Sequence, residues 1–229
     1  MTTLFIHHRL DAAPRRWQAL AERLARQGAA RLAEAGGTLY GVWRSQIGRP
    51  RDEVTVMTAW PAAITAAAAE RGLLGDDPDV CACRSDALLA TLRPTDATPP
   101  VRQGNYAFRW FATPTPHWPE FLDLCAAAWP GFEAAYDSQV IGLWQATGDR
   151  TGEGGDEASG AGLFDGVRSL LLTRRPNLAM WERSKLPQGQ AESAVRDALN
   201  RRYDLCDWTV VSTATLLTAT DRQDSARWT

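Results

Sequence analysis

The 229-residue sequence predicts an α+β fold built from two copies of one β-α-β-β-α-β unit, and two observations support this prediction. First, short motifs return at a constant distance. Phe-Ile-His-His-Arg-Leu at 5–10 resembles Tyr-Ala-Phe-Arg-Trp-Phe at 106–111, and Gly-Val-Trp at 41–43 resembles Gly-Leu-Trp at 142–144. The offsets from residue 5 to residue 106 and from residue 41 to residue 142 are both 101 positions. Second, the strand-like and helix-like patterns follow the same order in both copies.

The first copy begins with an apolar strand at 3–10. An amphipathic helix is predicted over 15–34, because apolar residues recur at helical spacing until Gly36-Gly37 ends the pattern. Two β-rich runs, 38–47 and 53–60, flank a turn of Gly-Arg-Pro-Arg-Asp and read as a hairpin. Pro61 then opens an alanine-rich helix over 62–74, and a final strand covers 87–93.

The second copy repeats this order with additions. We predict a strand at 105–112, a helix at 118–136 that Pro130 kinks or divides, a hairpin of 139–147 and 166–174, helices at 176–181 and 190–203, and a strand at 208–220. The hairpin connection at 149–162 is rich in Gly, Asp and Glu and is predicted to be a mobile loop, with a lid over a pocket as the alternative. A proline-containing linker at 95–102 separates the copies, and 221–229 is expected to be a loose tail. The domains are therefore predicted as 1–98 and 99–229.

Each unit forms an antiparallel sheet with both helices on one face, so the other face needs cover. Packing the two bare faces against each other provides that cover within one chain. The predicted product is an eight-stranded barrel with helices outside, whose interior is just wide enough for side chains or one small ligand.

Composition narrows the classes of partner. The net charge of −2 gives no attraction to phosphate or anionic lipid, so neither nucleic acid nor a membrane surface is expected to bind. Neither a signal peptide nor an apolar stretch of about 20 residues is evident, and a cytoplasmic protein with free thiols is expected. Cys81-Ala-Cys83 lacks the partner pair of a zinc site, so no metal site is predicted. Ten tryptophans favour a small-molecule cavity, and exposed helices or sheet edges leave room for a homodimer.

Three motifs resemble marks of the NIPSNAP family. They are the strand Tyr-Ala-Phe-Arg-Trp-Phe at 106–111, the paired Gly-x-Trp motifs at 41–43 and 142–144, and Arg-Pro-Asn-Leu-Ala-Met-Trp-Glu-Arg-Ser at 175–184. The resemblance covers most of both halves. It implies two ferredoxin-like units fused in tandem as a dimeric α/β barrel, a superfamily that includes cofactor-free monooxygenases, haem-binding enzymes, cyclases and isomerases. One departure is that His8 stands where the second copy has Arg109, so the two half-sites are not chemically equivalent.

Arg109 and His8 are the candidate catalytic residues. Because strand side chains alternate, the constant offset places His8 and Arg109 on the same side of equivalent strands. If this side faces the barrel interior, Arg109 would stabilise an oxyanion and His8 would exchange protons there. The structural alternative pairs the arginine with a carboxylate or with backbone carbonyl groups and leaves His8 at a solvated strand end.

Trp43, Trp144, Trp110 and Arg175 are the candidate substrate-binding residues. Trp43 and Trp144 each follow a strand glycine by two positions, which predicts a bulge or a close approach to the backbone. They would flank a ligand or, alternatively, pack the core. Arg175, with Arg174 and Arg183, would bind an anion at the barrel rim or belong to a solvated face.

The sequence therefore suggests a NIPSNAP-like enzyme that uses the barrel interior as a pocket for an apolar or aromatic substrate. Its reaction would be proton transfer or cofactor-independent oxygenation. A non-catalytic ligand-binding or scaffold protein is one alternative, and a haem-binding enzyme is another, since haem needs only one axial ligand. A small-molecule ligand is the expected partner, and no cofactor is expected unless haem binds.

Overall fold

The computed structural model describes residues 2–61, 64–152 and 166–221. The elements in chain order are β1 (Leu4–Ala12), α1 (Trp17–Arg23), the π-helical turn η1 (Leu24–Gly28), α2 (Ala29–Glu34), β2 (Thr38–Ile47), β3 (Glu53–Trp60), α3 (Ala66–Leu74), β4 (Val80–Arg93), β5 (Asn105–Pro114), the 3₁₀ turn η2 (Thr115–His117), α4 (Trp118–Tyr136), β6 (Gln139–Thr151), β7 (Gly166–Arg175), α5 (Leu178–Arg183), α6 (Gly189–Asp204) and β8 (Trp208–Leu216). We refer to β1–β4 with α1–α3 as the first half and to β5–β8 with α4–α6 as the second half.

The eight strands close into a barrel in the order β1-β3-β2-β8-β5-β7-β6-β4, with β4 pairing back to β1. All the pairs are antiparallel, and two of them, β2 with β8 and β4 with β6, join the halves. The predicted barrel of two packed sheets is therefore confirmed. The strands β2, β4, β6 and β8 would have been sheet edges in separate halves, but closure pairs them within the chain. A homodimer would therefore have to form through other surfaces.

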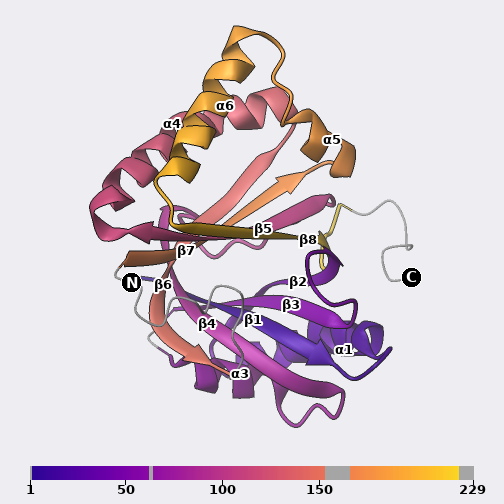
Figure 1. The fold of residues 1–229 in the computed structure, drawn as a ribbon. Coiled ribbons are helices and arrows are strands. Elements are labelled where there is room, and N and C mark those ends of the chain that lie inside the picture. Colours follow the sequence, from indigo (N-terminus) through magenta and orange to yellow (C-terminus); the bar gives the residue numbers. More distant parts are fainter. Residues whose placement is uncertain (1, 62–63, 153–165, 222–229) are drawn as a thin grey trace.

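Helices cover the barrel on two opposite sides (Figure 1). The helices α4, α5 and α6 lie over the sheet of the second half, and α1 and α3 lie outside the sheet of the first half. Each half thus has two buried layers: one between its sheet and its own helices, and one shared layer inside the barrel. The candidate residues fall into different layers, and that division determines what each of them does.

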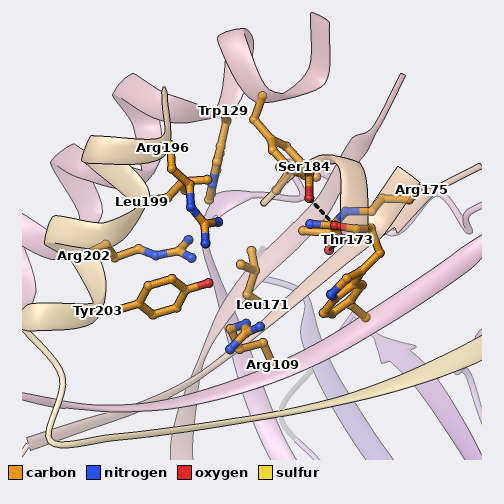
Figure 2. A pocket seen from close by; sticks show the side chains of 14 residues that line it. Arg109, Trp129, Leu171, Thr173, Arg175, Ser184, Arg196, Leu199, Arg202 and Tyr203 are labelled. Atoms are coloured by element: carbon orange, nitrogen blue, oxygen red, sulfur yellow. Dashed lines mark hydrogen bonds between the residues drawn. The ribbon is translucent and has the colours of Figure 1, made fainter. Parts of the chain in front are cut away.

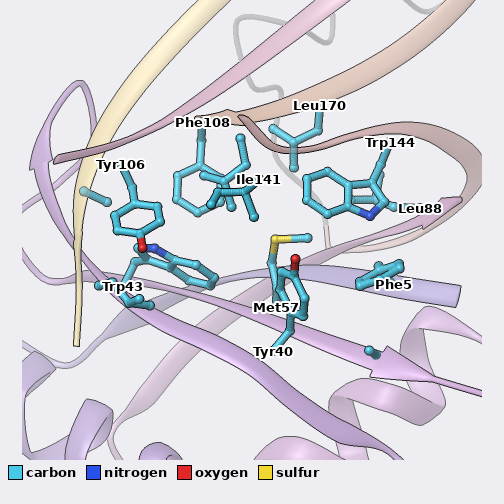
Figure 3. Packing of buried hydrophobic residues seen from close by; sticks show 14 of the residues in the cluster. Phe5, Tyr40, Trp43, Met57, Leu88, Tyr106, Phe108, Ile141, Trp144 and Leu170 are labelled. Atoms are coloured by element: carbon cyan, nitrogen blue, oxygen red, sulfur yellow. The ribbon is translucent and has the colours of Figure 1, made fainter. Parts of the chain in front are cut away.

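The barrel interior is packed with large aromatic side chains (Figure 3). Phe5, Trp43, Tyr106 and Phe108 belong to one buried cluster together with Trp144. Rings from the two halves touch there: the Phe5 and Trp144 centroids are 5.5 Å apart, and those of Trp43 and Phe108 are 5.2 Å apart. The side of β1 and β5 that faces inward is therefore the side of Phe5 and Phe108, not the side of His8 and Arg109.

The opposite side of these strands packs on helices. Ile6 and Leu10 of β1 share a cluster with Leu20 and Leu24, which lie on the helical segment α1 to η1. Phe111 of β5 shares the equivalent cluster of the second half with helix residues of α4. Both faces of the strands are apolar because both are buried, as expected for strands sandwiched between helices and a barrel interior.

The glycines that precede the paired tryptophans make room for the tryptophans themselves. A Cβ atom on Gly41 would overlap the indole of Trp43, and one on Gly142 would overlap that of Trp144. The strand register shifts next to both glycines, which confirms the predicted irregularity. The group that closely approaches the backbone at each glycine is therefore a tryptophan ring of the core.

Four details differ from the sequence-based expectations. The helix over 15–34 contains the π-helical turn η1, and β4 begins at Val80 rather than at 87. Helix α4 runs unbroken through Pro130, so the predicted division is wrong. Most of the predicted loop at 149–162 lies outside the described residues; the described part, through Thr151, continues β6. None of the described helices combines the length and apolarity needed to cross a membrane.

Candidate active site

A cavity of about 50 Å³ lies in the second half between the sheet and its covering helices (Figure 2). Its charged and polar lining comes from Arg109, Thr173, Arg175, Ser184, Arg196, Arg202 and Tyr203. Its apolar lining comes from Ala107, Trp129, Phe132, Val140, Leu171, Trp181 and Leu199. Since one enclosed water needs about 10–15 Å³ on this measure, the cavity has room for a few water-sized groups.

Strand alternation and helix periodicity bring these side chains together. Ala107 and Arg109 lie two residues apart on β5 and therefore share the side that faces the helices. On α6, Arg196, Leu199 and Tyr203 have the i, i+3, i+7 spacing of one helix face, which points down onto that sheet. Arg175 ends β7, so its side chain reaches the cavity from the side next to α5.

The cavity is strongly cationic. Four guanidinium groups line it, those of Arg109, Arg175, Arg196 and Arg202, and none of its described lining residues is an Asp, Glu, His or Cys. No described carboxylate forms an ion pair with any of the four. Arg202 is buried and the other three arginines are partly buried. Desolvated charge without a carboxylate partner costs stability, so this arrangement needs an explanation outside folding.

Burial perturbs two of these arginines directly. Desolvation lowers the pKa of Arg175 to about 10, and the like charges of Arg109, Arg196 and Arg202 contribute to the shift. Desolvation also lowers the pKa of Arg109. Both shifts mean that the folded protein disfavours these positive charges, and a bound anion would relieve that cost.

Aromatic rings supply part of the missing stabilisation. The guanidinium of Arg175 lies 4.6 Å from the ring centre of Trp181 and 5.0 Å from that of Phe132. The guanidinium of Arg202 lies 4.9 Å from the ring of Phe111 and reaches the Cys125 Sγ at 3.7 Å. Such cation–π contacts are worth roughly 0.5–2 kcal/mol each, less than a buried ion pair partner would provide. Both guanidinium groups can still donate hydrogen bonds to a ligand, because the Nε atoms of Arg175 and Arg202 are buried without a hydrogen-bond partner.

Tyr203 is the acidic group of this cavity. Its hydroxyl points toward the centre, among the side chains of Arg109, Arg196 and Leu171 in Figure 2. Desolvation raises the pKa of Tyr203, but the charges of Arg202 and Arg109, a hydrogen bond from Arg202 and the charge of Arg196 outweigh it, and the net pKa is lowered. The cavity therefore makes the phenolate of Tyr203 easier to form than it is in water.

Chemically, the arrangement is suited to holding an oxyanion. Guanidinium groups donate paired N–H bonds to planar carboxylate, enolate or phenolate oxygens. Fixed positive charge in a water-poor site stabilises developing negative charge better than water does. The apolar rings Trp129, Phe132 and Trp181 supply walls for the carbon skeleton of such a ligand.

Two of the residues proposed from the sequence, Arg109 and Arg175, meet in this cavity. His8 does not join them, because it lies between the sheet and the helices of the first half. It is fully buried, with Nδ1 2.8 Å from Ser85 Oγ and Nε2 3.1 Å from Thr58 Oγ1. Desolvation lowers its pKa to about 3. The expectation that His8 and Arg109 face each other inside the barrel is wrong, since both point outward from it.

Trp43, Trp144 and Trp110 also lie outside the cavity. Trp43 and Trp144 have no exposed surface and fill the barrel interior, which favours the core-packing alternative. Trp110 faces the interior too, where its ring contacts His7 at 5.7 Å between centroids. The pocket expected inside the barrel is therefore replaced, as the candidate site, by the cavity on the helix side of the second half.

The arginines grouped around Pro176 separate in space. Only Arg175 lines the cavity. Arg174 donates from Nε to the backbone oxygen of Gln103 at 2.7 Å. Arg183 pairs with Glu192 at 2.7 Å, next to the cavity but not in it.

Sequence reasoning missed Arg196, Arg202 and Tyr203. The available signal was the helix pattern itself: α6 was predicted, and these residues share or border one face of it. An arginine-rich face of a helix normally indicates that this face is exposed to solvent. Only the sheet below it, with Arg109 and Arg175, turns that face into a site.

At the equivalent position, the described residues of the first half have larger side chains. The register places Ile6 where the second half has Ala107, and Trp60 where it has Arg175. The Trp60 ring is 2% exposed and packs so closely on Gly37 that a Cβ atom there would lie 2.7 Å from it. The duplicated positions thus form a filled core in one half and a charged cavity in the other.

The cavity residues do not fit haem. Its described lining offers no imidazole, thiolate or thioether, and Tyr203, the one ligand-type group, is surrounded by guanidinium groups. Across the described part of the chain, no group of three or more His, Cys, Asp or Glu residues could hold a metal ion.

No protein-family model and no curated protein matches this sequence. Solved structures share its fold along nearly the whole chain. A protein from Lactobacillus acidophilus NCFM, provisionally described as a monooxygenase, has a TM-score of 0.57 and 9% identity, with 94% of each chain covered. An anthrone oxidase-like protein has a TM-score of 0.54 and 13% identity over 95% of this chain and 92% of that one. A chlorite dismutase from Candidatus Nitrospira defluvii has a TM-score of 0.54 and 6% identity over 93% and 90%. At such identities the likeness shows the dimeric α/β-barrel fold alone, and the NIPSNAP resemblance stays a prediction.

Proposed function

We propose that this protein is a small-molecule enzyme whose substrate is an aromatic or conjugated organic acid bound in the cavity of the second half. The substrate carries a carboxylate, enol or phenol oxygen toward the arginines, and its carbon skeleton lies against Trp129, Phe132 and Trp181. The reaction is proton transfer through an anionic intermediate. No cofactor is needed for that reaction, because the positive charge that stabilises the anion is supplied by the chain.

One observation carries the proposal: four guanidinium groups face one small cavity whose described lining contains no carboxylate. A protein that needed these arginines only for stability would pair them with Asp or Glu, as Arg9 is paired with Glu53 at 2.7 Å in this same chain. A ligand that brings its own negative charge would complete the site.

Arg109 and Arg175 have different places in this scheme. Arg109 projects from the middle of β5 beside Tyr203, where it would polarise the oxygen that gains charge during the reaction. Arg175 is held between two rings and would fix the acidic group of the substrate. Cofactor-independent oxygenation starts from the same kind of anion and is the second reaction class. The oxygen chemistry named for two proteins of the same fold makes it worth testing through consumption of dioxygen.

The non-catalytic alternative uses the same cavity as a binding site without turnover. Both readings predict selective binding of organic anions, so binding is tested first. Benzoate, its neutral isostere benzamide and the cation benzylamine would be titrated calorimetrically into the purified protein. Benzoate is expected to bind and benzylamine is not. Benzamide should bind at least about 10-fold more weakly than benzoate, because hydrogen bonds to charged groups are worth about 1.5–3 kcal/mol.

Matched variants localise the effect. Arg175→Met removes the charge inside the cavity and keeps an apolar stem, so benzoate affinity should fall at least about 10-fold. Arg201→Met removes an arginine of the same helix as Arg196 that pairs with Glu120 on the surface, and it should leave affinity unchanged. Equal affinities for benzoate and benzamide, or equal losses in the two variants, would contradict the proposed anion site.

A further inference from the structure

Among the described residues that line the cavity, one side chain is suited to accept a proton from a ligand. The arginines are protonated near neutral pH, since even the lowered pKa of Arg175 is about 10. The hydroxyls of Thr173 and Ser184 are engaged: Thr173 Oγ1 accepts from Arg175 Nη1 at 3.2 Å, and Ser184 Oγ donates to the backbone oxygen of Trp181 at 2.7 Å. His8, the proton carrier expected from the sequence, lies in the other half of the barrel. Among the described lining residues this leaves Tyr203.

Two guanidinium groups lie close to the ring of Tyr203. The guanidinium of Arg202 lies 5.0 Å from its ring centre and that of Arg109 lies 5.2 Å from it. The ring is stacked on Phe111 at 6.1 Å, so its orientation is fixed while the hydroxyl end faces the cavity. The position is therefore rigid, cationic and open to a ligand.

The charged and titratable groups around Tyr203 come from every element packed on it. Strand β5 contributes Arg109 and β7 contributes Arg175, while α6 contributes Arg196 and Arg202. From α4, Cys125 faces Arg202 rather than the cavity. No carboxylate among the described residues of the cavity opposes the four positive charges.

We infer that Tyr203 is the catalytic base of this cavity, and that the substrate is a carbon acid, a molecule with a C–H bond beside a carbonyl group. This inference rests on the proposed function, because it requires an organic acid in the same cavity. The Tyr203 phenolate removes the proton from carbon, so an O–H bond forms and the C–H bond breaks. The electron pair of the C–H bond moves into the conjugated system, and the carbonyl oxygen becomes the enolate oxygen.

The proton balance closes without an oxidant or a cofactor. Tyr203 returns its proton to another atom of the same conjugated anion, which gives an isomer and regenerates the phenolate. Throughout, the cavity holds the same total charge, because the negative charge only moves from the tyrosine oxygen to the substrate oxygen. The arginines that stabilise the phenolate therefore also stabilise the enolate, and the transfer needs little rearrangement of charge.

The pattern of tyrosine ionisation in this chain makes Tyr203 separately observable. The chain has four tyrosines. Desolvation raises the pKa of Tyr40, Tyr106 and Tyr136, whereas the arginines lower that of Tyr203. The first tyrosinate absorbance to appear as pH rises should belong to Tyr203 and should be missing in Tyr203→Phe.

The test uses phenylpyruvate as the probe, since it combines an aromatic ring, a carboxylate and an enolisable C–H. Its binding is measured by calorimetry, and loss of its enolisable C–H signal in D₂O is followed by proton NMR. The native protein should accelerate exchange with a rate that rises with pH and levels off at the pH of the first tyrosinate titration. Tyr203→Phe should bind phenylpyruvate with similar affinity but exchange it at least about 100-fold more slowly. Tyr106→Phe, which loses a hydroxyl inside the barrel, should exchange at the native rate.

The outcomes separate the two proposals. Binding without accelerated exchange in the native protein, or native exchange and an unchanged pH profile in Tyr203→Phe, overturns the role of Tyr203 and leaves the anion site standing. Absence of phenylpyruvate and benzoate binding in the native protein overturns both. Tyr203→Phe keeps the stacked ring, and a thermal melt confirms that it is folded before its exchange rate is interpreted.

Discussion

Trp60 and Arg175 occupy the same register position in the two halves of the barrel, with opposite consequences for the space beside them. Trp60 is paired with Leu4 on β1, and Arg175 is paired with Asn105 on β5. Asn105 lies 101 positions after Leu4, which is the offset between the two halves. The indole closes the space between sheet and helices, and its Nε1 donates to Thr58 Oγ1 at 2.9 Å. The guanidinium instead lines a cavity.

Trp60→Ala should destabilise the protein without affecting its ligand site. Removing a buried large aromatic side chain costs about 3–5 kcal/mol of unfolding free energy. Benzoate affinity should be unchanged, because Trp60 lies in the other half. Urea denaturation and calorimetric titration measure the two quantities. A loss of less than about 1 kcal/mol would show that the ring does not fill the first half.

Arg109→Met should weaken anion binding and stabilise the protein. The substitution keeps an apolar stem near Tyr203 and removes a partly buried charge that has no carboxylate partner among the described residues. We expect a gain of up to about 1–2 kcal/mol in unfolding free energy. Guanidinium chloride denaturation without ligand measures it. Arg9→Met removes the buried partner of Glu53 but leaves Arg84 at 3.3 Å, and it should instead lower stability by about 1.5–3 kcal/mol. A stability loss of that size in Arg109→Met would show that Arg109 is a structural residue.

His8 should make the protein less stable in acid. Its pKa is lowered from 6.5 to about 3 in the folded state, so between these values the unfolded chain binds more protons than the folded one. Stability therefore rises with pH across this window, is fully present above about 6.5 and is lost as pH falls toward 3. At about 1.36 kcal/mol for each pKa unit, the contribution is at most roughly 5 kcal/mol. Urea denaturation at a series of pH values, compared with His8→Asn, isolates it. An identical pH dependence in the variant would exclude His8 as the cause.

Gly41→Ala should destabilise the barrel, because the added methyl group meets the indole of Trp43. Overpacking of this kind costs about 1–3 kcal/mol. Gly72→Ala is the matched control: a Cβ atom there lies 3.5 Å from Trp60, an ordinary contact, within helix α3. It should be neutral or stabilising by up to about 1 kcal/mol. Thermal and urea melts of both variants test the pair, and equal losses would contradict the packing argument.

The sequence was sufficient for the architecture because the relevant signals are local. The strands 38–47 and 53–60 and the helix 118–136 match the structure to the residue, since turns and caps mark their ends. The beginning of β4 was missed because Cys81-Ala82-Cys83-Arg84 carries no alternating apolar pattern, although pairing with β1 holds it extended. Tertiary pairing decided that segment.

The site could be predicted only in part. Alternation shows that His8 and Arg109 share a side with Ile6 and Phe111, but it does not show where that side points when both sides are apolar. The larger rings of the opposite side, such as Phe108, were the indication that it faced the barrel. The contribution of α6 depends on the distance between helix and sheet, which no local pattern encodes.

Joining the two barrel halves in one polypeptide has an evolutionary consequence. In a barrel assembled from two identical subunits, every substitution appears on both sides of the symmetry axis, so a residue that opens one site opens the other. Here each position is inherited separately. The first half carries the buried ring of Trp60, while the second half carries the charges of Arg109 and Arg175. The stability lost to those charges is shared by the whole closed barrel.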